Sequence, residues 1–295
     1  MLILFILISS QKLLLKVTQE RIAHPDTSLR FLRFETPVFK GERHRHSQVE
    51  LTWIERGVGL RFVGDSAAPF DDNDMVLIGP NVPHAWVGSA DIRHQRSIAT
   101  VLQFPLDLLQ QSIFPELHHV AAIVGRARFG LSIGGKCRNA VIQVLTDMRA
   151  ANRFGRLAGL IEILGLLAAQ RASLKAIASS PMISTQETKS DRRVDRVIDW
   201  IHSNLANELD VVHAAEIAHV SPAAFSRYFH REVGKTFTRY INDVRCGEAC
   251  IKLRQSVKLV SIIASECGFK SAAHFNRQFR LRMGMVPREY RRTNQ

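Results

Sequence analysis

A fourteen-residue phrase occurs twice in the C-terminal third of the chain, fifty residues apart. The first copy, SPAAFSRYFHREVG, runs from Ser221 to Gly234, and the second, SAAHFNRQFRLRMG, runs from Ser271 to Gly284. Ser, Ala, Phe, Arg, Phe and Gly stand at the same six positions of both copies. This repetition predicts that one small structural unit is built twice within a single chain.

Each copy is predicted to be one helix with two different faces. The initial serine is a good N-cap, the final glycine a good helix stop, and the two phenylalanines are four residues apart on one face. The opposite face carries small, polar and basic side chains. These are Ala223, Ser226, Arg227 and His230 in the first copy and Ala273, Asn276, Arg277 and Arg280 in the second.

A shorter helix and a tight turn are expected before each copy, which is the pattern of a helix-turn-helix unit. The stretch between the copies has apolar residues at helical spacing and predicts one long connecting helix. Small outer residues allow close approach to a DNA groove, and arginine can bind guanine in bidentate fashion. Arg227 and Arg277 are therefore the predicted base-reading residues. The competing interpretation is a helical bundle whose exposed faces are merely solvated.

The charge balance fits a polyanionic partner. The 295 residues include 40 Lys+Arg and 27 Asp+Glu, a net charge of +13. Such an excess favours nucleic acid first and an anionic membrane surface second.

Residues 191–292 resemble the double helix-turn-helix domain of AraC/XylS-type transcription regulators. The resemblance is most specific in IIASECGFKSAAHFNRQFRLRMGMVPREYRR, from Ile262 to Arg292. It implies a sequence-specific regulator with double-stranded DNA as its partner and RNA polymerase as a further candidate. Two positions depart from the usual pattern: His219 stands where a turn glycine is common, and Gly247 interrupts the connecting helix. The helix glycine is expected to cost about 1 kcal/mol relative to alanine.

The N-terminal part is predicted to be a β-domain, because residues 27–104 contain short stretches of alternating apolar and polar residues separated by turns. The stretch VELTWIERG places Val49, Leu51 and Trp53 on one face, and Glu50 and Thr52 on the other. Residues 105–176 then change to helical spacing. The apolar helix around 157–168 is interpreted either as core of this domain or as a dimerising helix, and these alternatives stay open.

Three histidines and a glutamate in the β-domain resemble parts of the two cupin motifs: His44, His46 and Glu50 with Gly57, followed by His84 after Pro-x-x-Pro. The resemblance implies a β-barrel with these four side chains facing its interior, where metal-binding cupins hold a divalent metal. Three imidazoles and a carboxylate suit such an ion. Two alternatives remain, a metal-free effector site and a purely structural polar cluster. Trp53, Arg61 and Trp86 are further candidate contacts to a sugar or an organic acid.

The fold class expected is α+β multidomain: an N-terminal cupin-type β-barrel with a helical appendage, then an all-α double helix-turn-helix domain. The expected boundaries are 1–20 (extension), 21–105 (effector-binding barrel), 106–176 (helical dimerisation or connector region), 177–190 (linker) and 191–295 (DNA-binding domain).

The expected function is a transcription regulator that responds to a small polar effector. We expect a cytoplasmic homodimer without a membrane anchor, in which Cys137, Cys246, Cys250 and Cys267 are free thiols. No catalytic residues are assigned. The alternative function is a metal-dependent cupin enzyme fused to a DNA-binding domain.

Overall fold

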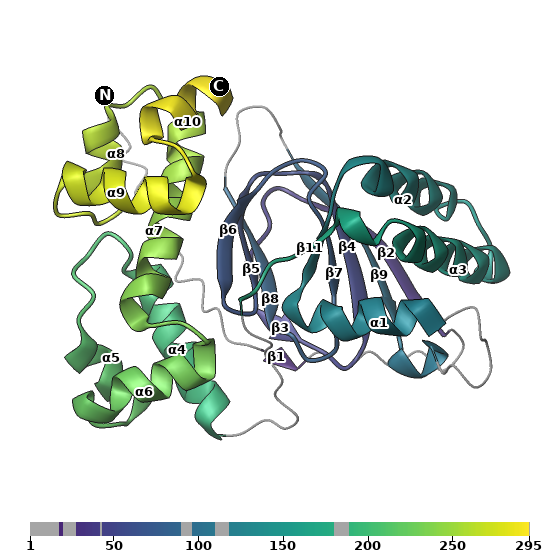
Figure 1. Cartoon of the computed structure of the whole chain (residues 1–295), viewed down its shortest axis with the longest axis horizontal. Coiled ribbons are helices and arrows are strands. Elements are labelled where there is room, and N and C mark those ends of the chain that lie inside the picture. Colours follow the sequence, from purple (N-terminus) through teal and green to yellow (C-terminus); the bar gives the residue numbers. More distant parts are fainter. Residues whose placement is uncertain are drawn as a thin grey trace, which may run out of the picture.

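The computed structural model describes residues 18–19, 28–41, 43–89, 96–109, 118–179 and 189–294. Most of the predicted N-terminal extension (1–20) and most of the predicted linker (177–190) lie outside the described residues. Two parts make up the described chain, an N-terminal β-domain that ends before residue 180 and a C-terminal helical domain that begins at residue 189 (Figure 1).

The β-domain contains two sheets. A five-stranded sheet has the order β1-β3-β8-β5-β6, and a six-stranded sheet has the order β11-β10-β7-β4-β9-β2. The strand bounds are β1 Thr18–Gln19, β2 Arg30–Thr36, β3 His44–Arg45, β4 Val49–Arg56, β5 Gly59–Val63, β6 Ser66–Phe70, β7 Met75–Ile78, β8 His84–Gly88, β9 Ser97–Phe104, β10 Leu131–Ile133 and β11 Leu174–Ala176.

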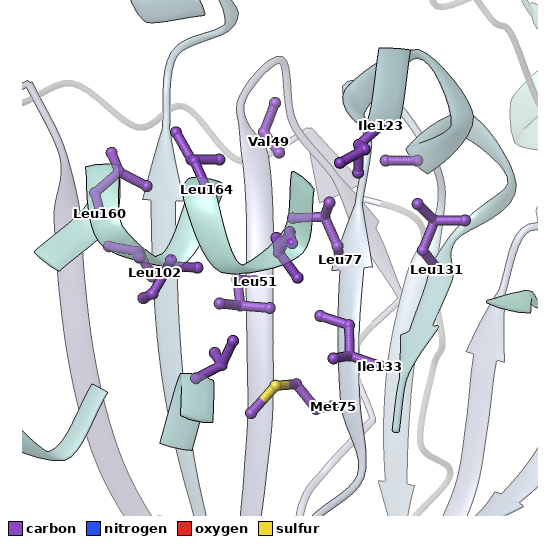
Figure 2. Packing of buried hydrophobic residues seen from close by; sticks show 14 of the residues in the cluster. Val49, Leu51, Met75, Leu77, Leu102, Ile123, Leu131, Ile133, Leu160 and Leu164 are labelled. Carbon is purple, nitrogen blue, oxygen red and sulfur yellow. The ribbon is translucent and has the colours of Figure 1, made fainter. Parts of the chain in front are cut away.

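Helices cover the outer face of the six-stranded sheet. Their bounds are α1 His118–Arg126, α2 Gly135–Asp147 and α3 Arg153–Ala169, with short 3-10 turns at Leu106–Leu109, Ala127–Phe129 and Arg171–Ser173. Figure 2 shows the core between sheet and helices, where Leu51 and Leu102 from the strands pack with Leu160 and Leu164 from α3. This contact buries a large apolar surface and confirms that α3 belongs to the core of the β-domain on one of its faces. Its opposite face remains exposed, so the dimerisation alternative also stays open.

The inner faces of the two sheets pack against each other. Phe39, Ile54, Val63, Val76 and Trp86 are among the buried side chains between them. The alternation predicted for β4 is confirmed, because 49, 51 and 53 face the helices whereas 50, 52 and 54 face the other sheet.

A closed barrel was expected, but the described strands form two separately hydrogen-bonded sheets, with no ladder between them among the described pairs. Apolar side chains hold the sheets together, as in a sandwich. Strands β10 and β11 fall inside the stretch expected to be helical. They are three residues each, too short to produce a recognisable alternation. Strand β10 pairs with β7 and β11 pairs with β10, so both extend the six-stranded sheet.

The C-terminal domain is helical in all its described elements. The bounds are α4 Lys189–Ser203, α5 Val211–Ala218, α6 Pro222–Val233, α7 Phe237–Gln255, α8 Val260–Glu266, α9 Ala272–Met283 and α10 Pro287–Asn294. The long helix α7 connects two helix pairs, α5–α6 and α8–α9, as the sequence predicts. We call these pairs the first unit and the second unit.

The helical domain packs directly on the five-stranded sheet (Figure 1). Leu60 and Phe62 on the outer face of β5 share a buried cluster with Val197, Ile198 and Ile201 of α4. Gly247 of α7 meets the same sheet, since a Cβ added there would lie 2.5 Å from Leu60 Cδ2. The glycine that weakens α7 on propensity grounds therefore permits the close contact between the two domains.

Within the described residues, no helix combines the length and the apolar character that crossing a membrane requires.

Candidate nucleic-acid interface and buried histidine cluster

The two repeated phrases form α6 and α9 with matching ends. Ser221 Oγ accepts a hydrogen bond from Ala224 N at 3.3 Å, and Ser271 Oγ accepts one from His274 N at 3.2 Å. Gly234 and Gly284 follow the helices with left-handed backbone angles, at φ 78° and 75°. The predicted caps and stops are confirmed, because both ends depend on residues adjacent in sequence.

The turns before α6 and α9 use different residues for the same conformation. His219 adopts φ 53° in the first unit, and Gly268 adopts φ 82° in the second. Histidine tolerates this left-handed region at a modest cost, so the turn survives the departure noted in the sequence. Glycine is required in the second unit, where an added Cβ would lie 2.4 Å from Leu205 O.

The two faces of each helix separate as predicted. Phe225, Phe229, Phe275 and Phe279 are all 0% exposed, and the first two pack on α7 through Phe237. The predicted reading residues are all exposed: Ala223, Ser226, Arg227, His230, Ala273, Asn276, Arg277 and Arg280. Neither helix is sealed against its own protein, which removes the main structural objection to a nucleic-acid interface.

The reading face of α9 is electropositive. Across the described part of the chain, neither Arg277 nor Arg280 takes part in an ion pair, so both guanidinium groups keep their hydrogen-bond donors for another molecule. Half-buried His274 lies beside this face, and burial, followed by the charge of Arg277, lowers its pKa. The positive charge of this face therefore comes mainly from arginine.

The four side chains of the cupin-like motifs come together in the β-domain. Ligand atoms of His44, His46, Glu50 and His84 all lie within 4.8 Å of one another. The imidazole centroids of His44 and His84 are 4.2 Å apart, and those of His46 and His84 are 5.3 Å apart. Strands β3, β4 and β8, together with His46 directly after β3, thus assemble residues that are up to 40 positions apart in sequence.

Glu50 is the centre of this cluster and is fully surrounded. His46 Nε2 lies 2.8 Å from Glu50 Oε2, and His84 Nε2 lies 3.5 Å from Glu50 Oε1. Gln103 Nε2 donates to Oε2 at 2.8 Å, and the Thr52 hydroxyl donates to Oε1. Burial by itself raises the pKa of Glu50, but His84 and His46 outweigh it and hold that pKa well below its usual range. The carboxylate is therefore ionised at the centre of the cluster.

The donor set fits a divalent metal. Nδ1 of His46 lies 3.1 Å from Gln48 O, and Nδ1 of His84 lies 2.8 Å from Val82 O, so both Nε2 atoms point toward Glu50. Backbone carbonyls orient metal-binding histidines in this way. A metal-free polar cluster would use the same contacts, so the geometry is compatible with both interpretations.

A cavity of about 630 Å³ opens beside the cluster. His44, Glu50 and Trp86, three of the predicted effector contacts, line it, whereas His46 and His84 are buried next to it. Most of the wall is apolar, and the remaining lining residues are Arg30, Leu32, Phe34, Thr36, Phe39, Lys40, Gly41, Thr52, Ile54, Ala99, Val101 and Gln103.

Besides His46 and His84, two further predicted effector contacts, Trp53 and Arg61, lie outside the cavity lining. Trp53 faces the helices, where the Arg149 guanidinium carbon lies 5.5 Å from its ring centroid, because position 53 has the opposite parity to positions 50 and 52. Arg61 is held by Asp74, which also accepts from Trp86 Nε1 at 3.1 Å. The Arg61 guanidinium therefore has a structural partner between the two sheets.

Among the lining residues that sequence reasoning missed are three with charged or amide side chains, Arg30, Lys40 and Gln103. Gln103 is opposite Glu50 in the pairing of β4 with β9, and Arg30 is opposite Gln103 in the pairing of β9 with β2. Only the strand register reveals that these residues lie at one cavity, because Arg30, Lys40 and Gln103 belong to separate segments without a recognisable motif.

Comparisons with known proteins agree with the helical geometry. A family model described as a helix-turn-helix domain matches residues 214–293. The chain is 25% identical over 264 residues to the HTH-type transcriptional activator RhaR of Escherichia coli O139:H28. The aligned region covers 89% of this chain and 90% of RhaR.

Solved structures with similar chains include two regulators. The C-terminal domain of AraT, a response regulator from Geobacillus stearothermophilus, is 27% identical, covers 36% of this chain and 88% of that chain, and has a TM-score of 0.34. ToxT from Vibrio cholerae O395 is 13% identical, covers 90% of this chain and 98% of that chain, and has a TM-score of 0.36. Both TM-scores are below 0.5, so the family assignment rests on the sequence matches.

The repeated units, their exposed basic faces and the sequence matches indicate a helix-turn-helix protein that is similar to known transcription regulators. More narrowly, the chain resembles the AraC/XylS-type transcription regulators.

Proposed function

We propose that this chain is a sequence-specific DNA-binding regulator that reads DNA with α6 and α9 as a double helix-turn-helix. The observation that carries this proposal is the matched exposure of the two helices. In both, aromatic residues are sealed inside while an arginine at the same position of the phrase faces outward. An ordinary helical bundle has no reason to repeat this arrangement.

Specific roles follow from side-chain chemistry. Arg227 and Arg277 are proposed to bind guanine O6 and N7, each in its own major-groove segment. Ala223 and Ala273 let the helix backbone approach the bases. The polar and basic neighbours, Ser226, His230, Asn276 and Arg280, are proposed to contact bases or phosphates. Two segments read from one frame would lie about one helical turn, ~34 Å, apart.

The test uses duplexes that the wild-type chain selects from a random pool. Arg277→Ala and Arg227→Ala are each expected to cost about 1–3 kcal/mol of binding free energy and to relax preference at one base pair. Arg56→Ala, which removes an exposed arginine from β4 in the β-domain, is the matched control and should bind as wild type. Binding should weaken steeply with added salt, because bound phosphates release counterions. Unchanged affinity and base preference in Arg277→Ala would remove the assignment of that residue.

The cavity beside the histidine cluster is the proposed effector site of a cupin-like domain. It has the size and the mostly apolar wall of a small-molecule site, with a few converging polar groups. A sugar and an organic acid were both expected from the sequence. Lys40 in the lining favours the organic acid, because it offers positive charge to a carboxylate while Glu50 is already occupied by its own donors. Arg30, which donates to Gln103 Oε1 at 3.4 Å, adds positive charge to the same wall. Thermal-shift screening with sugars and organic acids distinguishes the two.

The histidine cluster leaves two alternatives for the effector site, one with a bound metal ion and one without. Metal analysis of the purified chain before and after chelation separates these alternatives. A stoichiometric divalent ion whose removal abolishes the response to effector would support the metal site, and would give the cupin enzyme alternative its first specific support. The homologous regulators favour regulation over catalysis.

Three further expectations belong to the same proposal. RhaR is named a transcriptional activator, and we propose activation, with RNA polymerase as partner, for this chain also. We propose a homodimer because α3 exposes Phe154 and Ile161 on the face away from the sheet, with Phe154 84% exposed. We propose the cytoplasm as its location, where its DNA would be.

A further inference from the structure

We propose that Asp243 positions the two reading helices relative to each other, an inference that rests on the proposed function of α6 and α9. Asp243 lies in the connecting helix α7, and its carboxylate binds one cation from each unit. Lys235 Nζ lies 2.8 Å from Asp243 Oδ2, and Arg282 Nε lies 2.6 Å from Asp243 Oδ1. Both carboxylate oxygens are therefore used, one for each unit.

The two cations lie near the C-terminal ends of the two reading helices, at different positions of the repeated phrase. Lys235 directly follows Gly234, which ends α6, and Arg282 lies in the last turn of α9. The three side chains are mostly buried, with 10% of Lys235, 12% of Asp243 and 13% of Arg282 exposed. Charge-assisted hydrogen bonds of this length in such an environment are stronger and more directional than those of surface pairs. One carboxylate thus attaches the C-terminal ends of both reading helices to the same point of α7.

The arginine of this cluster has a fixed orientation. Arg282 NH1 donates to Gln278 Oε1 at 2.6 Å, and NH2 donates to Arg239 O at 3.4 Å. Its guanidinium spans α9 and the first turn of α7, so a movement of α9 along α7 would break several hydrogen bonds together. Asp243 provides the only carboxylate in this arrangement among the described ion pairs of Arg282.

A second residue of α7, Arg245, also contacts both units. Arg245 donates from Nε to Leu205 O at 3.1 Å and from NH2 to Asn207 O at 2.8 Å, which fixes the loop before α5. Its guanidinium carbon also lies 5.9 Å from the centroid of Phe269, in the turn before α9. The helix α7 therefore contacts both units through two charged side chains, of which Asp243 contacts the helix ends.

The consequence concerns DNA with two binding segments. Two reading helices held at one separation can enter both segments together, so the second contact gains from a high effective concentration. If Asp243 sets this separation, its loss should weaken binding to two segments and widen the tolerated spacing. Contact with a single segment should change little, because no base-reading residue is altered.

The variant Asp243→Asn is expected to fold. Lys235 Nζ also lies 4.0 Å from Oδ2 of Asp65, a buried carboxylate of the β-domain, so the lysine keeps an acidic neighbour. Asp243→Glu preserves the charge on a longer side chain and serves as the conservative variant. Glu248→Gln is the matched control, because Glu248 lies on the same helix and its carboxylate lies 3.9 Å from Lys252 of that same helix.

The experiment measures binding of the full chain to duplexes selected by the wild type, intact or with either segment randomised. Asp243→Asn should bind the intact duplex about tenfold more weakly, while binding to a single segment stays within about twofold. Insertion or deletion of one base pair between the segments should impair Asp243→Asn less than the wild type. Asp243→Glu should fall between the two, and Glu248→Gln should match the wild type.

Two results would overturn the inference. One is an Asp243→Asn variant with wild-type affinity and spacing preference. The other is an equal loss on intact and single-segment duplexes, which would indicate general destabilisation. A wild-type chain that selects no sequence at all would instead refute the proposed function, and the inference with it.

Discussion

The first and second helix pairs carry the same phrase, but only the first shares its core with the β-domain. Phe225 and Phe229 belong to one buried cluster with Leu60 and Phe62 of β5. Phe275 and Phe279 belong to a separate cluster, whose described members all come from the helical domain. The same local sequence is therefore placed in two different tertiary settings.

The polar contacts between the domains show the same difference. Arg43 of the β-domain donates to Asp195 of α4 at 3.0 Å, and both side chains are mostly buried. Near the second unit, Arg254 at the end of α7 pairs at 2.6 Å with Asp71, whose side chain is 41% exposed. A change in the β-domain thus reaches the first unit through a buried interface, and the second unit mainly through α7.

The largest change in stability is expected when one aromatic residue is removed from each of the two buried clusters. Phe229→Ala and Phe279→Ala should each lower the free energy of unfolding by about 3–5 kcal/mol, because both leave a cavity in a fully buried site. Calorimetry should show that Phe229→Ala also shifts the unfolding of the β-domain, whereas Phe279→Ala shifts the helical domain alone. An unchanged β-domain transition in Phe229→Ala would contradict the shared core.

A smaller effect is expected from the ion pairs between the domains. Arg43→Met should destabilise the chain by about 2–4 kcal/mol, because it leaves Asp195 mostly buried without its arginine. Arg254→Met should cost less than about 1 kcal/mol, because Asp71 is partly solvated. Urea unfolding of both variants measures the difference, and equal costs would mean that the two contacts do not differ as described.

The smallest effect concerns pH at the buried contact. Burial, opposed by Arg43 and assisted by Asp195, raises the pKa of Asp199 from its ordinary value near 3.8 to about 7. The folded chain therefore holds this proton more tightly than the unfolded chain. The resulting stability is complete below the unfolded pKa and is lost as pH rises through about 7.

Asp199→Asn should accordingly flatten the dependence of the melting temperature on pH between about 4 and 7, measured in parallel with the wild type. An identical slope in both proteins would exclude Asp199 as the titrating group.

Much of the helical domain could be predicted because its signals are local. Ser221 and Gly234, like Ser271 and Gly284, act on backbone groups within a few positions of themselves. The parity of β4 was equally informative, because it placed Trp53 on the face opposite Glu50, and this conflicts with the expectation that both residues contact one effector. The role of Gly247 could not be predicted from its neighbours in sequence, because this glycine permits a close contact with Leu60, 187 positions earlier in the sequence.

By itself, the sequence determined the two capped helices, their buried phenylalanines and exposed arginines, and the alternating strands that carry the histidines. These features follow from side-chain periodicity and from hydrogen bonds between near neighbours. Only the tertiary structure decided that Arg30, Lys40 and Gln103 meet at one cavity, and that Asp243 joins Lys235 to Arg282. Such contacts depend on strand register and helix packing, which bring together residues whose separation along the chain carries no periodic signal.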